Sequence, residues 1–359
     1  MEDRDALRAA SRVIHTHGDM PPARMLADVA AWCEEHDVAL DHYGEGELIE
    51  AFEAEVAERL GYEAGRFMPS GTMAQQIALR IWADRAGNHT VGMHPTAHVE
   101  LHEQRGYAHL HGLHATLIGP EREPMLAEHL AAVPSPLAAV LTELPIREAG
   151  AQLPTWEQLE ELKAMAGERG IPLHLDGARL WGCAPAFGHD YAEICRGFAS
   201  CYVSFYKGIG ALPGSMLLGA KDFIDEAVVW QRRSGGNLFT LTPNVASAAM
   251  QWEGRLAKMP AYLERARRLA EAIHEIEGVR VLPDPPHVNM MHLFFDLDAE
   301  EALAARDRVA EETGIWVFSW AGPADVPGVS WTELYVGDAA MEVGDDEIAR
   351  AFTLLFEEA

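Results

Sequence analysis

The fold is set by two short stretches, His174-Leu175-Asp176-Gly177-Ala178-Arg179 and Ser204-Phe205-Tyr206-Lys207-Gly208-Ile209-Gly210. Asp176 and Lys207 each follow a β-prone run and are 31 residues apart. Lys207 is one of only four lysines in the chain, and the other three lie among charged or helix-like neighbours. A pyridoxal phosphate (PLP) enzyme needs a lysine and an aspartate that each end a buried strand. The lysine amine condenses with the aldehyde, and the carboxylate keeps the pyridine nitrogen protonated, which makes the ring an electron sink.

Both stretches also have a simpler interpretation as turns. Asp-Gly is among the commonest turn dipeptides, and a Lys-Gly pair after a strand is often only a turn. Neither fragment alone indicates cofactor chemistry. Their order along the chain, with each following a β-type run, is what favours a PLP site.

The length and composition of the chain exclude several classes of protein. A chain of 359 residues is long enough for two domains with substantial cores. The 28 basic and 56 acidic residues give a net charge of −28, which argues against a nucleic acid partner and against an anionic membrane surface. No apolar stretch is long enough to cross a bilayer, and the acidic start Met1–Asp5 does not resemble a signal peptide. We therefore expect a cytoplasmic protein.

Strand and helix patterns alternate along residues 41–256, which predicts an α/β domain with a mostly parallel, seven-stranded sheet covered by helices. Residues 1–40 are expected to form an N-terminal segment. From about Met259 the pattern changes, and residues 257–359 predict a smaller C-terminal α+β domain that opens with a separate helix from Pro260 to Ile276. The strands of the large domain are expected near 66–68, 90–93, 115–118, 138–143, 172–175, 201–206 and 215–219.

Ser70-Gly71-Thr72 follows one of these strands and begins a helix. The N–H groups and partial positive charge of a helix N-terminus bind phosphate well, and the hydroxyls of Ser70 and Thr72 can add hydrogen bonds. A simple helix cap is the alternative interpretation. At the start of an α/β domain, a phosphate site is the better prediction.

Asp176 is expected at the carboxyl end of a strand, where open α/β sheets bind their ligands. Arg179 lies three residues further on and can point at the same ligand, either at the phenolate oxygen of the cofactor or at a substrate carboxylate. An ordinary surface ion pair is the alternative for Arg179.

Histidines and cysteines could in principle bind a metal. His94, His98 and His102 are spaced by four residues, but Pro95 makes one continuous helix doubtful and no acidic ligand has a standard zinc spacing. We expect no metal site. His98 is better placed as an aromatic lid over the cofactor ring, from where it could also exchange protons with a substrate. The four cysteines show no C-x-x-C pairing and are expected to be buried thiols.

Several motifs together resemble the low-specificity threonine aldolase branch of the aromatic β-eliminating lyase superfamily. The similarity covers roughly residues 40–250 in order. The motifs that carry it are Tyr43-Gly44-Glu45, the helix ending Glu53-x-x-Val56-Ala57-Glu58, Pro69-Ser70-Gly71-Thr72-Met73-Ala74-x-Gln76, Ala97-His98, His174 to Trp181, and Ser204-x-x-Lys207-Gly208-x-Gly210.

The resemblance implies the aspartate aminotransferase-like fold (PLP fold type I) and cleavage of β-hydroxy-α-amino acids to glycine and an aldehyde. It implies a homo-oligomer, a dimer or tetramer with active sites at the dimer interface. By the same resemblance, Lys207 would bond covalently to PLP, Asp176 would pair with the ring nitrogen and His98 would stack on the ring. The residues that would complete the site are Ser70, Gly71 and Thr72 at the phosphate, Ser204 near the cofactor, and Arg179 beside the cofactor and the substrate carboxylate.

The chain departs from the family pattern at three places. Relatives usually carry Leu-Glu-Asn-Thr-His where this chain has Leu141-Thr142-Glu143-Leu144-Pro145-Ile146, so the histidine aligns with Ile146. The C-terminal arginine that grips the substrate carboxylate aligns with Glu333, and the Met-Arg-Gln of the glycine loop reads Leu238-Phe239-Thr240. A glutamate at the position of Glu333 would repel a carboxylate. Either another arginine binds the substrate carboxylate, or the substrate differs. The candidate arginines are Arg147, Arg179, Arg232 and Arg233.

We therefore expect a PLP-dependent lyase of the threonine aldolase type that acts on a small-molecule substrate, a β-hydroxy-α-amino acid, with Lys207, Asp176 and His98 as catalytic residues. Two alternatives remain open. One is other PLP chemistry on an amino acid, such as β-elimination, transamination or aldol transfer. The other is a non-catalytic ligand-binding protein that kept the fold.

Overall fold

The computed structural model describes residues 2–357, which divide into two compact units. The larger unit is Pro22–Leu256, and the smaller one combines Met1–Pro21 with Ala257–Ala359. The N-terminal segment expected over residues 1–40 is therefore divided between the two units. The physical reason is strand pairing, because β1 (Arg12–Val13) runs parallel to β11 (Ile315–Trp316) of the smaller unit.

The larger unit is built on a seven-stranded sheet, and all seven strands predicted from the sequence are present. Its order is β2-β8-β7-β6-β5-β3-β4, and only β8 runs antiparallel to its neighbours. The central strands are buried along their whole length, as expected for a parallel sheet covered on both faces. The strands are β2 (Ala64–Met68), β3 (Thr90–Met93), β4 (His114–Leu117), β5 (Ala139–Glu143), β6 (Leu173–Gly177), β7 (Ser200–Ser204) and β8 (Ser215–Gly219).

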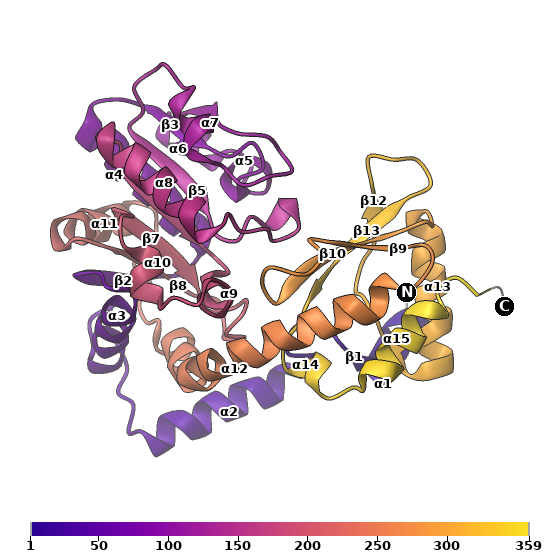
Figure 1. The fold of residues 1–359 in the computed structure, drawn as a ribbon. Coiled ribbons are helices and arrows are strands. Elements are labelled where there is room, and N and C mark those ends of the chain that lie inside the picture. Colours follow the sequence, from indigo (N-terminus) through magenta and orange to yellow (C-terminus); the bar gives the residue numbers. More distant parts are fainter. Residues whose placement is uncertain (1, 358–359) are drawn as a thin grey trace. The chain divides into compact units, whose positions relative to one another are not determined.

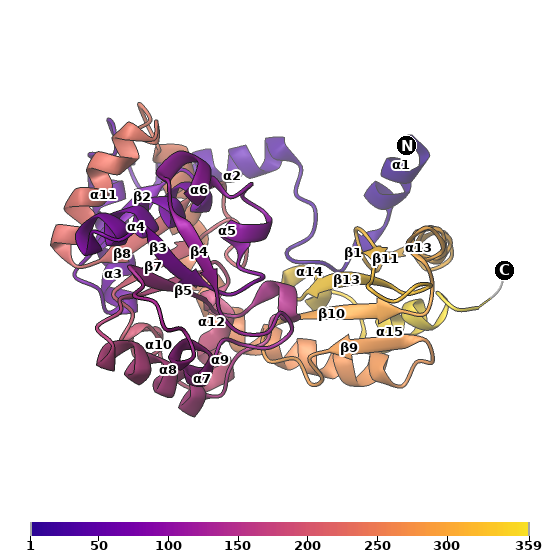
Figure 2. The same cartoon turned by 90° about the horizontal axis from the view of Figure 1, so that it is seen from above.

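Helices cover the two faces of this sheet (Figures 1 and 2). On one face, α4 (Gly71–Ala86) and α11 (Lys221–Arg233) bury Ile77, Ile81 and Phe223 against Tyr202 and other residues of the sheet. Figure 2 shows α8 (Trp156–Glu168) and α10 (Tyr191–Cys195) on the opposite face. The remaining helices of this unit are α2 (Pro22–Glu35), α3 (Glu47–Leu60), α5 (His98–Leu101), α6 (Gly106–His111), α7 (Ala127–Ala131) and α9 (Cys183–Phe187).

The helix α12 (Thr242–His274) is continuous, so the prediction of a separate helix beginning at Pro260 is wrong. A proline inside a helix removes one backbone hydrogen bond and tends to kink or break the helix. Here the helix continues past Pro260 because buried side chains follow at helical spacing, namely Leu263, Ala266, Leu269, Ala270 and Ile273.

The smaller unit has a four-stranded antiparallel sheet in the order β12-β13-β10-β9. Its α+β character matches the prediction for the C-terminal domain. The strands are β9 (Val279–Leu282), β10 (Met290–Phe295), β12 (Gly322–Pro323) and β13 (Ser330–Tyr335), and the helices are α1 (Glu2–Ala10), α13 (Ala299–Thr313), α14 (Asp338–Met341) and α15 (Asp345–Thr353).

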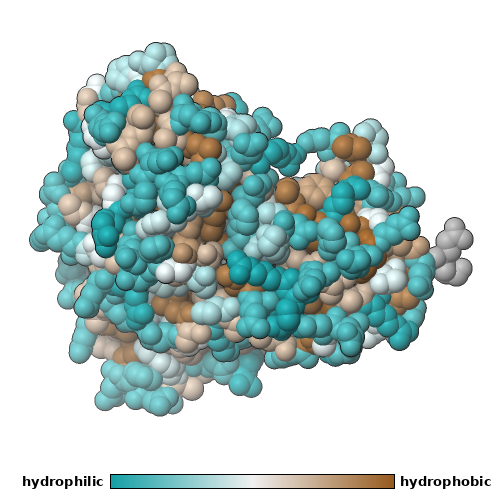
Figure 3. Space-filling model, in the orientation of Figure 1, coloured by the Kyte–Doolittle hydropathy of each residue, from teal (hydrophilic) through white to brown (hydrophobic). Residues whose placement is uncertain are grey.

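The face in Figure 3 is mainly hydrophilic, with smaller apolar areas between polar side chains. Within residues 2–357, no helix has the length and apolar character that a membrane span requires.

Candidate active site

A pocket in the larger unit lies where β5, β6 and β7 end. Because parallel strands present their carboxyl ends at one edge of a sheet, residues far apart in sequence meet there. Asp176 of β6 and Lys207, just beyond β7, line the pocket together with Glu143 of β5. His98 and Glu103 contribute from the α5 region, and the other lining residues are Thr72, Gln75, Ala178, Arg179, Tyr202 and Tyr206.

Asp176 is 1% exposed, and each of its carboxylate oxygens accepts a hydrogen bond. Oδ1 accepts from the backbone N–H of Ala178 at 3.0 Å, and Oδ2 accepts from the side-chain amide of Gln75. Burial raises the pKa of Asp176 above its usual value, and the positive charge of Lys207 and the Ala178 N–H offset this only in part. The two donors fix the orientation of the carboxyl group.

A chain of buried hydrogen bonds fixes the orientation of Gln75. His174 Nε2 lies 2.8 Å from Gln75 Oε1, and His174 Nδ1 lies 2.8 Å from Ser200 Oγ, which in turn accepts from Trp82 Nε1. Burial lowers the pKa of His174 to about 3, so the imidazole is neutral and has one donor and one acceptor. The Gln75 carbonyl requires Nε2–H as the donor, which leaves Nδ1 to accept from Ser200. The amide group of Gln75 is thus aimed at Asp176.

Lys207 lies in the turn that follows β7. The turn closes by hydrogen bonds from Gly210 N to Lys207 O at 3.1 Å and from Ala211 N to Phe205 O at 2.9 Å, and Gly210 has a φ of 79° that favours glycine. Burial and the nearby Arg179 lower the pKa of Lys207 to about 8, against the opposing charges of Asp176 and Glu143. A substantial fraction of the amine is then neutral near pH 8, as a nucleophilic lysine requires.

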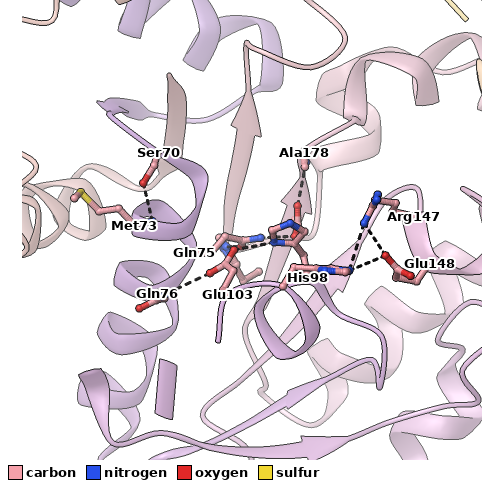
Figure 4. A network of polar contacts seen from close by, with 12 residues as sticks. Ser70, Met73, Gln75, Gln76, His98, Glu103, Arg147, Glu148 and Ala178 are labelled. Carbon is pink, nitrogen blue, oxygen red and sulfur yellow. Dashed lines mark hydrogen bonds and ion pairs between the residues drawn. The ribbon is translucent and has the colours of Figure 1, made fainter. Parts of the chain in front are cut away.

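His98 is oriented by the buried carboxyl group of Glu103. His98 Nδ1 lies 2.9 Å from Glu103 Oε1, and Gln76 Nε2 donates to the other oxygen at 3.3 Å (Figure 4). An ionised carboxylate can only accept hydrogen bonds, so Nδ1 is the donor and Nε2 remains available as a proton acceptor. The Glu103 side chain is 2% exposed and that of His98 is 34% exposed, which suits a fixed orienting group and an accessible base.

Glu143 is the second carboxyl group at this edge of the sheet. It is the register partner of Asp176 between β5 and β6, and its Oε1 accepts from the Arg147 backbone N–H at 3.1 Å. Burial and the neighbouring Asp176 raise the pKa of Glu143 to about 8. Glu143 therefore carries a proton over much of the neutral pH range.

The start of α4 approaches the pocket closely. Ser70 caps the helix by accepting from Met73 N at 3.3 Å (Figure 4). Thr72 lines the pocket. A Cβ at Gly71 would lie 2.0 Å from the Tyr202 hydroxyl, so only glycine fits there without displacing Tyr202. The helix N-terminus is thereby brought against the wall that Tyr202 forms.

Comparison with known proteins identifies the family. The chain matches the family described as "Beta-eliminating lyase" over residues 19–297. The chain belongs to the β-eliminating lyase family. It is 30% identical to the low specificity L-threonine aldolase of Escherichia coli (strain K12) over 241 residues, which cover 66% of this chain and 72% of that protein. It is 28% identical to low-specificity L-threonine aldolase 1 of Arabidopsis thaliana over 275 residues, covering 73% and 76%.

A solved structure of a provisionally assigned L-allo-threonine aldolase from Listeria monocytogenes EGD-E superposes with a TM-score of 0.91. It is 38% identical to this chain and covers 98% of each chain. This similarity confirms the prediction of PLP fold type I.

Enzymes of the β-eliminating lyase family use PLP, and the residues of this pocket fit that cofactor. Asp176 presents a buried carboxylate with fixed orientation, and Lys207 presents an amine with a lowered pKa in the same pocket. Gly71 lets the start of α4 pack directly against the Tyr202 hydroxyl. The free N–H groups of a helix N-terminus, such as the start of α4 beside this pocket, can bind a phosphate.

The structure does not bring all predicted site residues into this pocket. Ser204 is fully buried, and its hydroxyl donates to Ala178 O at 2.8 Å, so it supports the strand ends and does not line the pocket. Arg179 lines the pocket, whereas Arg147 does not and instead binds Glu148 at 2.7 Å. Glu333 belongs to the smaller unit, where its side chain lies 3.6 Å from His292. The roles assigned to these four residues remain predictions.

The histidines of the sequence do not form a metal site. Among the side chains of residues 4–357, no group of three or more His, Cys, Asp or Glu could hold a metal ion. The ring of His94 is instead hydrogen-bonded to Thr96 Oγ1 and to the carbonyl oxygens of Pro120 and Glu123. All four cysteines are free thiols, and Cys183, Cys195 and Cys201 are buried.

Sequence reasoning missed three groups that shape the site, namely Gln75, Glu103 and Glu143. For two of these residues, the sequence contains a feature that could have indicated their role. Glu143 is an acidic residue at the end of an otherwise apolar run, and Glu103 follows His98 by five residues in a segment with other acidic residues. No feature of the sequence indicates the role of Gln75, because that role depends on the packing of α4 against β6.

Proposed function

We propose that this member of the β-eliminating lyase family is a PLP-dependent aldehyde-lyase that cleaves a β-hydroxy-α-amino acid to glycine and an aldehyde. The observation that carries the proposal is the convergence of Lys207, Asp176 and His98 on one pocket. The identity of about 30% to low-specificity threonine aldolases supports the reaction type and leaves the substrate side chain open.

PLP, when bound, supplies an electron sink for the bond that breaks. Lys207 would hold it covalently through Nζ, and Asp176, oriented by Gln75 and Ala178, would pair with its ring nitrogen. Thr72 and the backbone at Gly71 would hold the phosphate, with Ser70 nearby.

His98 acts on the substrate as the general base. Glu103 fixes the proton on Nδ1, so Nε2 is the atom that takes the proton from the β-hydroxyl group. In this chain the histidine of the related Leu-Glu-Asn-Thr-His motif is absent, and Ile146 at that position is 2% exposed and carries no proton-transfer group. His98 is therefore the base that the pocket offers.

Arg179 is the proposed partner of the substrate carboxylate, since it is the arginine that lines the pocket. A guanidinium can bind a carboxylate with two parallel hydrogen bonds, which orients the substrate as well as binding it. Arg147 and Glu333 remain secondary candidates for substrate contact.

The proposal is tested by incubating the PLP-loaded protein with a panel of β-hydroxy-α-amino acids of both stereochemistries, including threonine and allo-threonine. Release of equimolar glycine and aldehyde is expected. Absence of turnover across the panel would contradict the aldolase reaction and leave the cofactor proposal intact.

A second candidate is other PLP chemistry on an amino acid, such as β-elimination, transamination or aldol transfer. The observation that favours it is the pair of changes at Ile146 and Glu333, which remove a base and a cation that relatives carry. Formation of pyruvate, ammonia or pyridoxamine phosphate in the same incubations would support this candidate. A non-catalytic protein is disfavoured because the residues for covalent PLP binding are retained.

We also propose a cytoplasmic homo-oligomer, a dimer or tetramer. Its support is the family resemblance together with a set of exposed apolar side chains on the larger unit. Tyr43 and Phe239 are 52% and 57% exposed and contact each other edge to face at 5.6 Å, and Leu40 and Leu238 are exposed beside them in the sequence. Exposed aromatic side chains of this kind are typical of protein interfaces.

A further inference from the structure

Glu143 is a buried acid of the pocket to which the proposed reaction gives no role. It ends β5 as the register partner of Asp176 on β6, and it is 5% exposed. Its Oε1 accepts a hydrogen bond from the Arg147 backbone N–H at 3.1 Å, whereas its Oε2 is buried and has no hydrogen-bond partner among the described residues. Since Glu143 lines the pocket, Oε2 is the polar atom that it can offer to a ligand there.

The surroundings of Glu143 favour its protonated form. Burial and the charge of Asp176 raise the pKa of Glu143 to about 8, against the opposing effects of the Arg147 N–H, Arg179 and Lys207. Asp176 has a hydrogen-bond donor on each oxygen, so Glu143, with one donor, is the neighbour that keeps a proton more readily. Because Oε1 already accepts the Arg147 N–H, the proton is on Oε2. The O–H group formed there is a buried donor that a ligand acceptor would satisfy.

The polar groups of PLP indicate which acceptor this is. By the proposed function, the aldehyde would meet Lys207, the ring nitrogen would meet Asp176, and the phosphate would meet the start of α4. The group that remains is the ring oxygen at C3, beside the carbon that carries the aldehyde. As an anion, this oxygen only accepts hydrogen bonds, so it requires a donor from the pocket.

We propose that Glu143 donates a hydrogen bond from its Oε2–H group to the C3 oxygen of PLP. The neutral acid suits this role, because an O–H donor binds an anionic oxygen strongly, whereas a carboxylate would repel it. A carboxylic acid that an apolar site keeps protonated is an effective donor of this kind. The assignment leaves Arg179 for the substrate carboxylate, in a chain where Glu333 aligns with the arginine that relatives use for that contact.

The inference rests on the proposed function for the orientation of PLP, and its test contains no amino acid, so that the two can fail separately. The full chain without PLP is titrated with PLP and with 3-deoxy-PLP, an analogue that keeps the aldehyde, the ring nitrogen and the phosphate. The ratio of the two dissociation constants measures what the C3 oxygen contributes to binding. A change of this ratio in a variant measures the coupling between that oxygen and the substituted side chain.

Two substitutions at position 143 separate a donor from an anion. Glu143→Leu removes the donor, whereas Glu143→Gln keeps an acceptor for the Arg147 N–H and places an N–H donor where the O–H was. We expect Glu143→Leu to lower the preference for PLP over the analogue by about 10- to 100-fold, and Glu143→Gln to retain most of it. A side chain that acted as an anion or a base would lose its role equally in both variants.

Glu53→Leu is the matched control. Glu53 is also largely buried and accepts a backbone N–H, that of Phe67 at 2.7 Å, but it does not line the pocket. The control should therefore leave the ratio unchanged. The inference is overturned if Glu143→Leu keeps the wild-type preference, if Glu143→Gln loses it to the same extent, or if Glu53→Leu lowers it equally.

Infrared difference spectra of the wild-type chain decide the matter should Glu143→Leu not fold. Binding of PLP should move the C=O stretching band of a protonated carboxyl group to lower frequency, because its O–H group gains an acceptor. Binding of 3-deoxy-PLP should not move the band, and the band should be missing from the spectra of Glu143→Gln. A band that stays in place with PLP, or that moves equally with both compounds, would contradict the inference.

Discussion

Gln75 on α4 donates a side-chain hydrogen bond to Oδ2 of Asp176 on β6, while its own carbonyl group is held by His174. The contact links a helix and a strand that are 101 residues apart. It orients the carboxylate that would meet the PLP ring nitrogen. The position of Asp176 is therefore set by a chain of hydrogen-bonded groups that begins at the partly buried Trp82 and not by the strand alone.

Replacing Gln75 by leucine should weaken PLP binding. The substitution removes one donor from a buried carboxylate, and a hydrogen bond to a charged group contributes about 1.5–3 kcal/mol. We expect an increase of about 10- to 100-fold in the dissociation constant for PLP, measured by equilibrium dialysis or fluorescence titration. Gln231→Leu is the control, because Gln231 is equally buried but binds Arg66 and Phe67 O. An equal loss of PLP affinity in both variants would show a general packing effect.

Replacing His98 by phenylalanine should separate stacking from proton transfer. The ring remains able to cover PLP, but the Nε2 acceptor is lost, so kcat for aldol cleavage should fall about 10²- to 10⁴-fold with little change in PLP binding. His109→Phe, at an exposed position of α6, should leave kcat unchanged. Retention of full activity by His98→Phe would assign the base to another group.

Glu103→Gln tests the orienting role of that residue. Glutamine carries both a donor and an acceptor, so the side chain at position 103 no longer fixes which ring nitrogen of His98 carries the proton. We expect kcat to fall with KM and PLP affinity nearly unchanged. A loss of PLP affinity as large as the loss in kcat would indicate that Glu103 has only a structural role.

The largely buried carboxyl group of Glu53, whose side chain is 13% exposed, should make the stability of the protein depend on pH. Burial raises its pKa from 4.5 to about 7 in spite of the nearby Arg66. Because the folded state binds the proton more tightly, the contribution of Glu53 to stability is full below pH 4.5 and is lost as the pH rises through about 7. Glu53→Gln should remove about 3 kcal/mol of pH-dependent stability from this interval, measured by urea unfolding at several pH values. Parallel curves for both proteins would contradict this assignment.

The exposed aromatic pair of Tyr43 and Phe239 should lie in the contact between copies of the chain. Phe239→Asp would place a charge in that contact, so a dimer or tetramer should dissociate towards monomer in sedimentation or light-scattering measurements. Leu110→Asp, at a position that is 76% exposed on α6, is the control. An assembly that survives Phe239→Asp and dissociates on Leu110→Asp would place the contact elsewhere.

The sequence predicts the sheet of the larger unit well because its strands are short apolar runs between helices with regular periodicity. The same local patterns locate Asp176 and Lys207, since strand ends can be recognised without tertiary information. The continuity of α12 through Pro260 could not be predicted, because tertiary packing there outweighs the local effect of proline. The pairing of residues 12–13 with 315–316 also depends on tertiary structure, because nothing in either dipeptide specifies its partner.

The polar groups around Asp176 and Lys207 were harder to predict, because their contacts also depend on tertiary structure. Gln75, His174 and Ser200 are ordinary residues in their own segments, and they become a network only when α4 packs on the sheet. Ser204 illustrates the opposite case, because its place in the motif with Lys207 predicted a cofactor contact, whereas its hydroxyl binds Ala178 O. Motif position alone does not determine where a side chain points.

The most direct test of the account is to add PLP to the protein, reduce with borohydride and map the modified peptide by mass spectrometry. We predict a single PLP group on Nζ of Lys207 and none on that peptide in Lys207→Ala. Modification at Lys163, Lys221 or Lys258 in its place, or no stable modification of the wild-type chain, would contradict the central claim.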